Sequence, residues 1–256
     1  MKNLLKSKIE NNIIKFEVKI RKNLQLYSFS KDAIISFSKK SKEQFDDYEF
    51  KHFLKKFKKI NFRQDAEIKN INYKEIPTYG NNLIKNELSN LIFILNISDF
   101  EAWLGDFFNL LFLNDHNLFL KFGNKDKDEN QIKLFMITES NDIEEIWQKI
   151  IDKHLNSKFY KGMPYILDSL LLVCCIKKDK DFEDIIGQIN EHCLSRNLII
   201  HNKNKVNIEY IKKAGKYARF NDVGTLIDIS EDYLFRQVDN LLYFMQKIRH
   251  KIIKSV

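Results

Sequence analysis

The chain almost lacks the two residue types that interrupt helices, with 2 prolines and 7 glycines among its 256 residues. Proline removes a backbone donor and clashes inside a helix, and glycine is the next least favourable residue there. Hydrophobic residues make up 44% of the chain, enough for one large core. We therefore predict a mainly helical protein with polar turns.

The cysteine pattern and the lengths of the apolar runs indicate in which cellular compartment the protein resides. The odd number of cysteines and the lack of Cys-x-x-Cys spacing argue against a disulfide framework or a zinc site, so we expect buried thiols at Cys174, Cys175 and Cys193. We expect no metal and no other cofactor. The N-terminus lacks a signal-peptide core, and the apolar runs 88–97 and 167–176 have about half of the ~20 residues that span a bilayer. We expect a cytoplasmic protein with no membrane partner.

The positive charge is concentrated at the N-terminal end. Residues 1–80 hold 19 Lys and Arg against 10 Asp and Glu, whereas the rest of the chain is close to neutral. The segment 51–63 interleaves lysine with phenylalanine, which suits phosphate attraction and base stacking. An amphipathic helix with a solvated lysine face explains the same pattern, and the two interpretations are compatible. The candidate RNA-binding residues here are Lys51, Lys55, Lys56, Lys58, Lys59 and Arg63.

Two local patterns suggest that this N-terminal region is distinct. Alternation around Phe16, Val18 and Ile20 predicts a short strand within 13–30, which would make the region mixed α/β. Pro77 and Gly80, with asparagines around them, mark a boundary. We therefore predict a basic region at 1–80 that binds RNA or a partner, followed by a helical domain at 83–256.

The second region has the apolar periodicity of helices. Apolar residues recur at three- and four-residue steps in 83–112, 140–155, 163–176, 179–202 and 230–254. We prefer one helix over 83–112 to two helices divided by a cap at Ser98. Ser140 or Asn141 and Ser230 are the expected caps of later helices, and 223–230 is an extended connector. The result is a bundle of four or five helices.

One segment places polar groups where the helix should be buried. On a wheel of about 100° per residue, Arg196 and Asn197 lie about 40° and 60° to either side of Phe182, and His201 lies about 40° beyond Asn197. A buried guanidinium needs an anion, an acidic partner or a wet cleft. The internal carboxylates that we consider are Glu191, Asp168 and Asp106. His192 points away from His201, and we treat it as a bystander.

These three side chains suit RNA cleavage without a metal. Histidine can take the proton of a ribose 2′-hydroxyl or protonate the leaving 5′-oxygen, and arginine can hold the phosphate. Asn197 would orient His201 or the ribose. One histidine does not easily perform both proton transfers, so the scheme requires a second copy, most simply in a homodimer. The product would carry a 2′,3′-cyclic phosphate.

The same residues carry a resemblance to a known family. The sequence RNLIIHN (196–202) resembles the motif of the HEPN domain superfamily, in which Arg196, Asn197 and His201 match the three motif positions. The segments 100–112, 206–215 and 224–234 are similar to the early helix, the segment after the motif and the entry to the last helix of the larger HEPN ribonuclease branch. The resemblance covers roughly residues 83–250.

The resemblance implies a HEPN-like helical bundle that dimerises with its motif helices face to face. It also implies a metal-independent endoribonuclease, of the kind found as toxins or antiphage effectors, acting on RNA such as transfer RNA and held by an antitoxin or a sensor protein. Lys203 and Lys205, which follow the motif, are further RNA-binding candidates. Lys203 replaces the tyrosine of members that a nucleotidyltransferase antitoxin controls, so regulation through that tyrosine is not expected.

Two alternatives stay open at this point. The first is a non-catalytic HEPN module, an interaction, regulatory or nucleotide-binding subunit. The second is a helical partner-binding protein in which Arg196 pairs with an internal carboxylate. All three motif positions are intact, which favours the nuclease.

Overall fold

The computed structural model describes residues 2–44, 76–122 and 138–255, and the mainly helical prediction is confirmed. Within these residues no strand forms, and the only β-type contact is a bridge between Lys205 and Leu226. The elements, in chain order, are α1 (Lys2–Gln44), α3 (Ile76–Asn82), the π-helical turn η2 (Leu83–Leu88), α4 (Ser89–Asn114), α5 (His116–Phe122), α7 (Ile143–Phe159), α8 (Met163–Val173), α9 (Lys180–His201), α10 (Ile208–Ala214), the 3₁₀ turn η3 (Gly215–Tyr217) and α11 (Glu231–Ser255).

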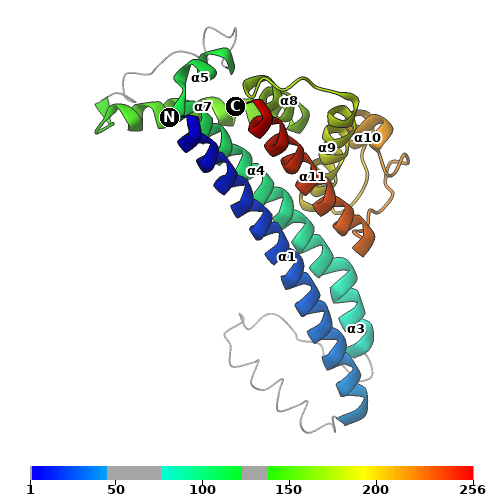
Figure 1. Ribbon diagram of the computed structural model, residues 1–256. Helices are drawn as coiled ribbons and strands as arrows, with labels where there is room; N and C mark the ends of the chain where they lie inside the picture. The colour runs from blue at the N-terminus through cyan, green and yellow to red at the C-terminus, as the bar shows by residue number, and fades with distance from the viewer. Residues whose placement is uncertain (1, 45–75, 123–137, 256) are drawn as a thin grey trace.

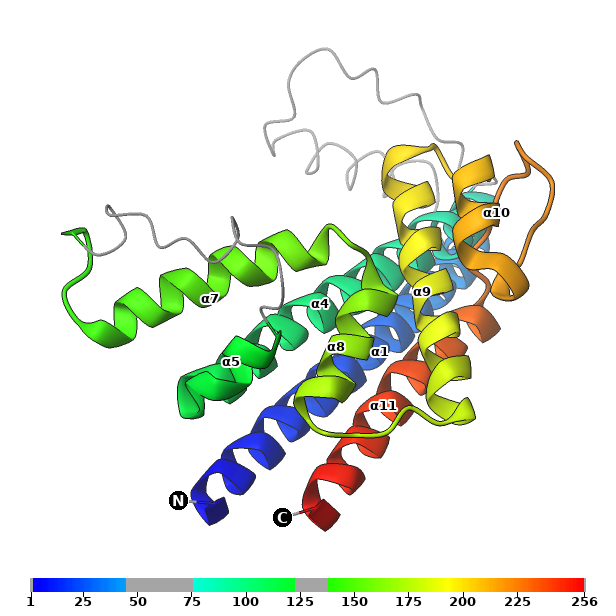
Figure 2. The same ribbon diagram turned by 90° about the horizontal axis from the view of Figure 1, so that it is seen from above.

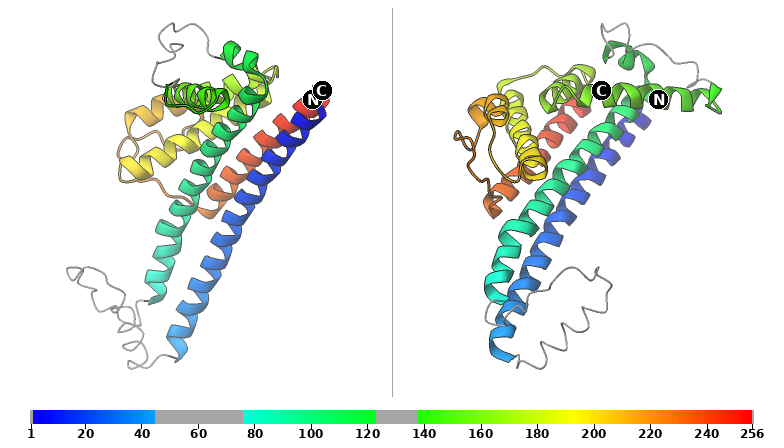
Figure 3. Two further views of the ribbon diagram at one scale, coloured as in Figure 1. Left: turned by 90° about the vertical axis from the view of Figure 1, so that its left-hand side faces the viewer. Right: turned by 180° about the vertical axis from the view of Figure 1, so that it is seen from behind.

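Three long helices form the centre of the molecule. Helix α1 runs antiparallel to the α3–η2–α4 rod, and α11 lies against both (Figure 1). Helices α8, α9 and α10 lie on one side of this trio in Figure 1, and the view from above shows α8 and α9 crossing over it (Figure 2). Both chain ends lie together at one end of the trio (Figure 3). One apolar cluster joins α1, α4, α5, α7, α8, α9 and α11.

The strand predicted within 13–30 is wrong, because α1 is one unbroken helix. A strand would place Phe16, Val18 and Ile20 on one face. Instead Phe16 and Ile20 are buried and Val18 is exposed, as expected for residues two apart on a helix. The alternating polarity was a short stretch of a helical pattern, in which Ile9, Ile13 and Phe16 continue the buried face.

The boundary residues lie inside a helix. Pro77 is in the first turn of α3, where its missing N–H is not needed. Gly80 lets α3 approach α1 closely, since a Cβ there would lie 2.4 Å from the Ser38 hydroxyl oxygen. The described N-terminal residues 2–44 thus pack into the same core as the later helices. The candidates Lys51–Arg63 lie outside the described residues.

The later helices follow the predicted segments closely. The rod from Ile76 to Asn114 continues through Ser98, so one helix is correct there. Asp142, rather than Ser140 or Asn141, caps α7 by accepting from the backbone N–H of Glu145. The Ser230 hydroxyl accepts from the Tyr233 N–H at 3.3 Å at the start of α11.

The three thiols differ in their exposure. Cys193 is buried and Cys174 is partly buried, and burial raises the pKa of Cys174 to about 12. Cys175 is exposed, contrary to expectation. The reason is local: α8 has already ended at Val173, and Cys175 turns the chain with φ of 54°.

A buried polar bridge sets the register of the three long helices. The Asn23 amide of α1 donates to Asn96 Oδ1 at 3.0 Å and to Asp99 Oδ2 at 2.9 Å. Asn96 donates to Gln237 Oε1 of α11 at 3.1 Å, and Gln237 donates to the Phe93 carbonyl at 3.0 Å. Sliding one helix along another would leave these buried groups unpaired, which is expensive.

Replacing the centre of this bridge should destabilise the fold. Asn96→Ala removes one of the two hydrogen bonds of the Asn23 amide and leaves the buried Gln237 Oε1 without its donor, so the free energy of unfolding should fall by about 1–3 kcal/mol. Urea unfolding followed by circular dichroism measures it. Asn82→Ala, at an exposed asparagine with no capping hydrogen bond, is the control. Equal stability of the two variants would contradict the bridge.

Candidate functional site

The motif lies in the last turns of α9, whose rotation is fixed by its apolar face. Asp179 caps the helix by accepting from the Phe182 N–H at 2.9 Å. The residues that then face the core are buried. They include Phe182, Ile185, Ile186, Ile189 and Cys193.

Arg196 continues the core-facing side of α9 and meets a carboxylate there. Its Nη2 donates to Glu101 of α4, while its Nε is buried without a partner. The Arg196 side chain is 18% exposed and that of Glu101 is 32% exposed, so the pair lies at the edge of the core. Burial raises the pKa of Glu101, and the charge of Arg196 opposes that rise only in part.

None of the three carboxylates expected for Arg196 is its partner. Glu191 lies in a separate buried cluster, Asp168 pairs with Lys178 at 2.7 Å, and Asp106 is exposed. Helical spacing showed that Arg196 needed an anion but did not show which neighbouring helix would supply it. That choice depends on the packing of α4 against α9.

Asn197 and His201 are exposed and share a face of α9. Positions four apart lie about 40° apart around a helix, whereas Arg196 and His201 are about 140° apart. A cleft of about 440 Å³ is lined by Arg196, Asn197 and Lys213 among others, and one of about 340 Å³ by Asn197, His201 and Lys213 among others. The motif residues therefore line two adjoining clefts that share Leu194, Asn197 and Lys213.

The other predicted lysines lie just beyond the motif. Lys203 and Lys205 are exposed in the loop that follows α9. Lys203 and Asn204 both have positive φ, which turns the chain back so that Val206 donates to the Thr225 carbonyl at 2.9 Å. The connector 223–230, predicted to be extended, begins with a turn at Val223 and Gly224, and only 225–230 is free of helix and turn.

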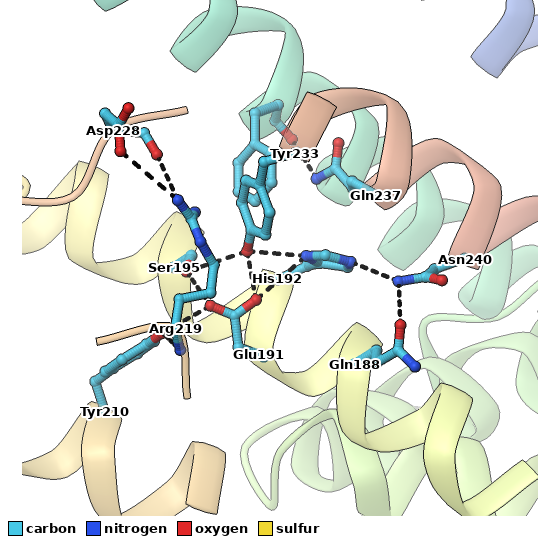
Figure 4. Close-up of polar contacts among 11 residues, drawn as sticks. Gln188, Glu191, His192, Ser195, Tyr210, Arg219, Asp228, Tyr233, Gln237 and Asn240 are labelled. Carbon is cyan, nitrogen blue, oxygen red and sulfur yellow. Dashed lines mark hydrogen bonds and ion pairs between the residues drawn. The ribbon is translucent and has the colours of Figure 1, made fainter. Parts of the chain in front are cut away.

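Another face of α9 holds a buried polar cluster centred on Glu191 (Figure 4). Ser195 and Tyr210 both donate to Glu191 Oε1 at 2.7 Å, and the Tyr233 hydroxyl donates to Oε2. The Arg219 guanidinium lies 3.5 Å from the centre of the Tyr233 ring. One carboxylate thus joins α9 to α10 and α11.

His192 extends this cluster as a neutral ring. Its Nδ1 lies 2.9 Å from the Tyr233 hydroxyl, and its Nε2 lies 2.9 Å from the Asn240 amide nitrogen. The Tyr233 proton is already donated to Glu191, so Nδ1 must carry the proton that bonds Tyr233, and Nε2 accepts from Asn240. Burial lowers the pKa of His192, which agrees with a neutral ring.

The remaining groups of the cluster respond to the charge of Glu191. Burial acts to raise the pKa of Glu191, but the neighbouring His192 ring and the hydrogen bonds from Tyr233 and Tyr210 outweigh it, and the pKa is lowered. Burial and the Glu191 charge raise the pKa of both Tyr210 and Tyr233. The cluster therefore holds one carboxylate anion among neutral donors.

Sequence patterns did not reveal this cluster. His192 is a buried part of it and not a bystander, and Tyr210, Arg219 and Tyr233 come from positions far along the chain. The one available signal was Glu191 and His192 on a helix that is otherwise packed, with Ser195 one turn later.

Comparison of the chain with protein-family models, curated protein sequences and solved structures gives no match. Among the described residues, no helix combines the length and apolar character that a membrane crossing requires. In the same residues, no group of three or more His, Cys, Asp and Glu side chains is arranged to hold a metal ion.

The neutral state of His192 should appear in the pH dependence of stability. Its folded pKa lies below its unfolded value, so the unfolded chain binds the proton first and stability falls as the pH drops below about 6.5. The slope should reach at most about 1.4 kcal/mol per pH unit. His192→Gln keeps one donor and one acceptor, and should remove this part of the slope in urea unfolding between pH 5 and 7.

The exposed His201 provides the control for this measurement. His201→Ala should retain the slope, because this side chain takes no part in the cluster. A His192→Gln variant with the parent slope would show that His192 is not held neutral.

Proposed function

We propose that the protein is a metal-independent endoribonuclease whose active site is completed by a second copy of the chain. The observation that carries this proposal is that Arg196, Asn197 and His201 line two adjoining clefts at the exposed end of one helix. The resemblance of residues 196–202 to the HEPN motif supports it. It also favours RNA as the substrate and an antitoxin or a sensor protein as the partner that restrains activity.

Each motif residue has a role in this scheme. Arg196 is held at the cleft edge by Glu101, so it binds the scissile phosphate and stabilises the charge that develops on its oxygens. His201 is accessible to solvent, as an acid or base that exchanges protons with substrate must be. Asn197 lines both clefts and orients the ribose between the two groups.

The need for a second copy follows from helix geometry. Arg196 and His201 point about 140° apart and are separated by about 7.5 Å along the helix axis, so one copy does not aim both at one phosphorus. A twofold axis beside α9 would bring His201 of one copy towards Arg196 of the other. It would also supply two histidines, one for each proton transfer.

A non-catalytic helical module is the second candidate, and the Arg196–Glu101 ion pair favours it. The guanidinium already has a carboxylate within its own chain, so its presence on a packed helix needs no phosphate. This module would present Asn197 and His201 to a partner without chemistry. Activity measurements separate the two candidates.

Cleavage in EDTA is the first test. The purified protein should cut total or transfer RNA and leave 2′,3′-cyclic ends, and His201→Ala and Arg196→Ala should each lower the rate by at least about 100-fold. His250→Ala and Arg249→Ala, in the last helix, are the matched controls and should cut like the parent. The mass of each variant in solution is measured alongside.

The results divide the two candidates. A parent that does not cut, or a His201→Ala variant that cuts normally, would contradict the nuclease. If the parent does not cut, the non-catalytic module is the better description of the protein.

Mixing variants tests the shared site. If each site needs a histidine from both copies, coexpressing parent and His201→Ala chains in equal amounts leaves roughly a quarter of the dimers fully intact. Activity should then be about a quarter of the parent value rather than a half. A value of a half would contradict a site that needs both histidines, and a monomeric mass by analytical ultracentrifugation would contradict a composite site.

A further inference from the structure

The Arg196 cleft contains an aromatic side chain that the cleavage scheme does not use. Tyr160 lines this cleft and is 93% exposed. Within the described residues no ring or cation contacts its ring. An isolated exposed aromatic is common on protein surfaces and by itself indicates nothing. Tyr160, however, lines the same cleft as the motif arginine Arg196, and this position indicates a role in binding.

The backbone fixes where Tyr160 stands. It is the C-cap of α7, and the next two N–H groups close a tight turn: Lys161 donates to the Lys158 carbonyl at 2.9 Å and Gly162 to the Phe159 carbonyl at 3.1 Å. Gly162 has φ of 96°, which favours glycine, and Pro164 lies in the first turn of α8. The turn therefore fixes the backbone position from which the exposed Tyr160 ring extends.

The rest of the cleft combines apolar residues, such as Phe159 and Met163, with basic and polar ones. Arg196, Lys161 and Lys213 line it against one carboxylate, Glu101. Lys213 pairs with Glu209 at 2.7 Å, but both side chains are more than 60% exposed, so this pair is weak. Asn190 donates to the Lys213 carbonyl at 3.1 Å and so joins α9 to α10 across the cleft. The cleft offers an anion site beside a free aromatic face.

We infer that Tyr160 stacks on an unpaired nucleobase of the RNA whose phosphate lies against Arg196. A nucleotide joins a flat π surface to an anion, and the cleft presents a partner for each. Bases inside a duplex already stack on one another, so only a single-stranded or looped segment can use this ring. The inference rests on the proposed function for the identity of the phosphate, and it makes the cleft selective for single strands.

Binding to an uncleavable RNA tests this separately from catalysis. A short fluorescent single strand with 2′-O-methyl groups lacks the 2′-hydroxyl nucleophile, so anisotropy at fixed salt reports affinity alone. Tyr160→Ala should raise Kd about 5- to 150-fold, the range measured for loss of one base stack. Tyr160→Phe keeps the ring and should stay within about twofold of the parent. Tyr243→Ala, at an exposed tyrosine of α11, should bind like the parent.

The outcomes distinguish this inference from the nuclease proposal. A parent that does not bind the single strand, or a Tyr160→Ala variant that binds it as the parent does, overturns the stacking role. An equal loss of affinity for a blunt duplex also overturns it. If Tyr160-dependent binding occurs but unmodified RNA is not cut in EDTA, stacking stands and the nuclease proposal fails. Cleavage without Tyr160-dependent binding gives the reverse result.

Discussion

The buried carboxylate of Glu191 is the interaction on which the geometry around the motif depends. An ionised carboxylate inside a protein is costly unless hydrogen bonds replace the water that it loses. Ser195, Tyr210 and Tyr233 donate to it, and these residues come from α9, α10 and α11. Any shift of one helix breaks at least one of these bonds, so the cluster holds the three helices in a single arrangement.

This arrangement sets the directions of the motif side chains. With Glu191 turned towards α10 and α11, the residue five positions later, Arg196, faces α4 and meets Glu101. Asn197 and His201 are turned to the surface, where two clefts adjoin. Glu101 lies in the segment 100–112 and Arg196 in 196–202, so the pair links two of the segments that led to the proposed HEPN resemblance. The Glu191 cluster and the Arg196–Glu101 pair thus hold the proposed active-site residues in place.

The three long helices α1, α4 and α11 hold the elements around α9 in position. Helix α1 does not form a separate basic module in its described part but contributes Ile13, Phe16 and Ile20 to the common core. The Asn23–Asn96–Gln237 bridge sets the register of α1, α4 and α11. Helix α4 also carries Glu101, which contacts Arg196, and α11 carries Tyr233, which contacts Glu191. The register of the long helices therefore fixes the positions of two residues that contact α9.

The sequence by itself determined the helices and the chemical character of the motif. Apolar spacing is a local property, and it located α4, α7, α8, α9 and α11 and showed that Arg196 required an anion. Tertiary structure decided which anion, because Glu101 is 95 positions away and reaches Arg196 only through the packing of α4 on α9. It also decided that 13–30 is helical, since only burial separates Val18 from Phe16 and Ile20. The Glu191 cluster was beyond sequence reasoning for the same reason: its donors meet only after three helices pack together.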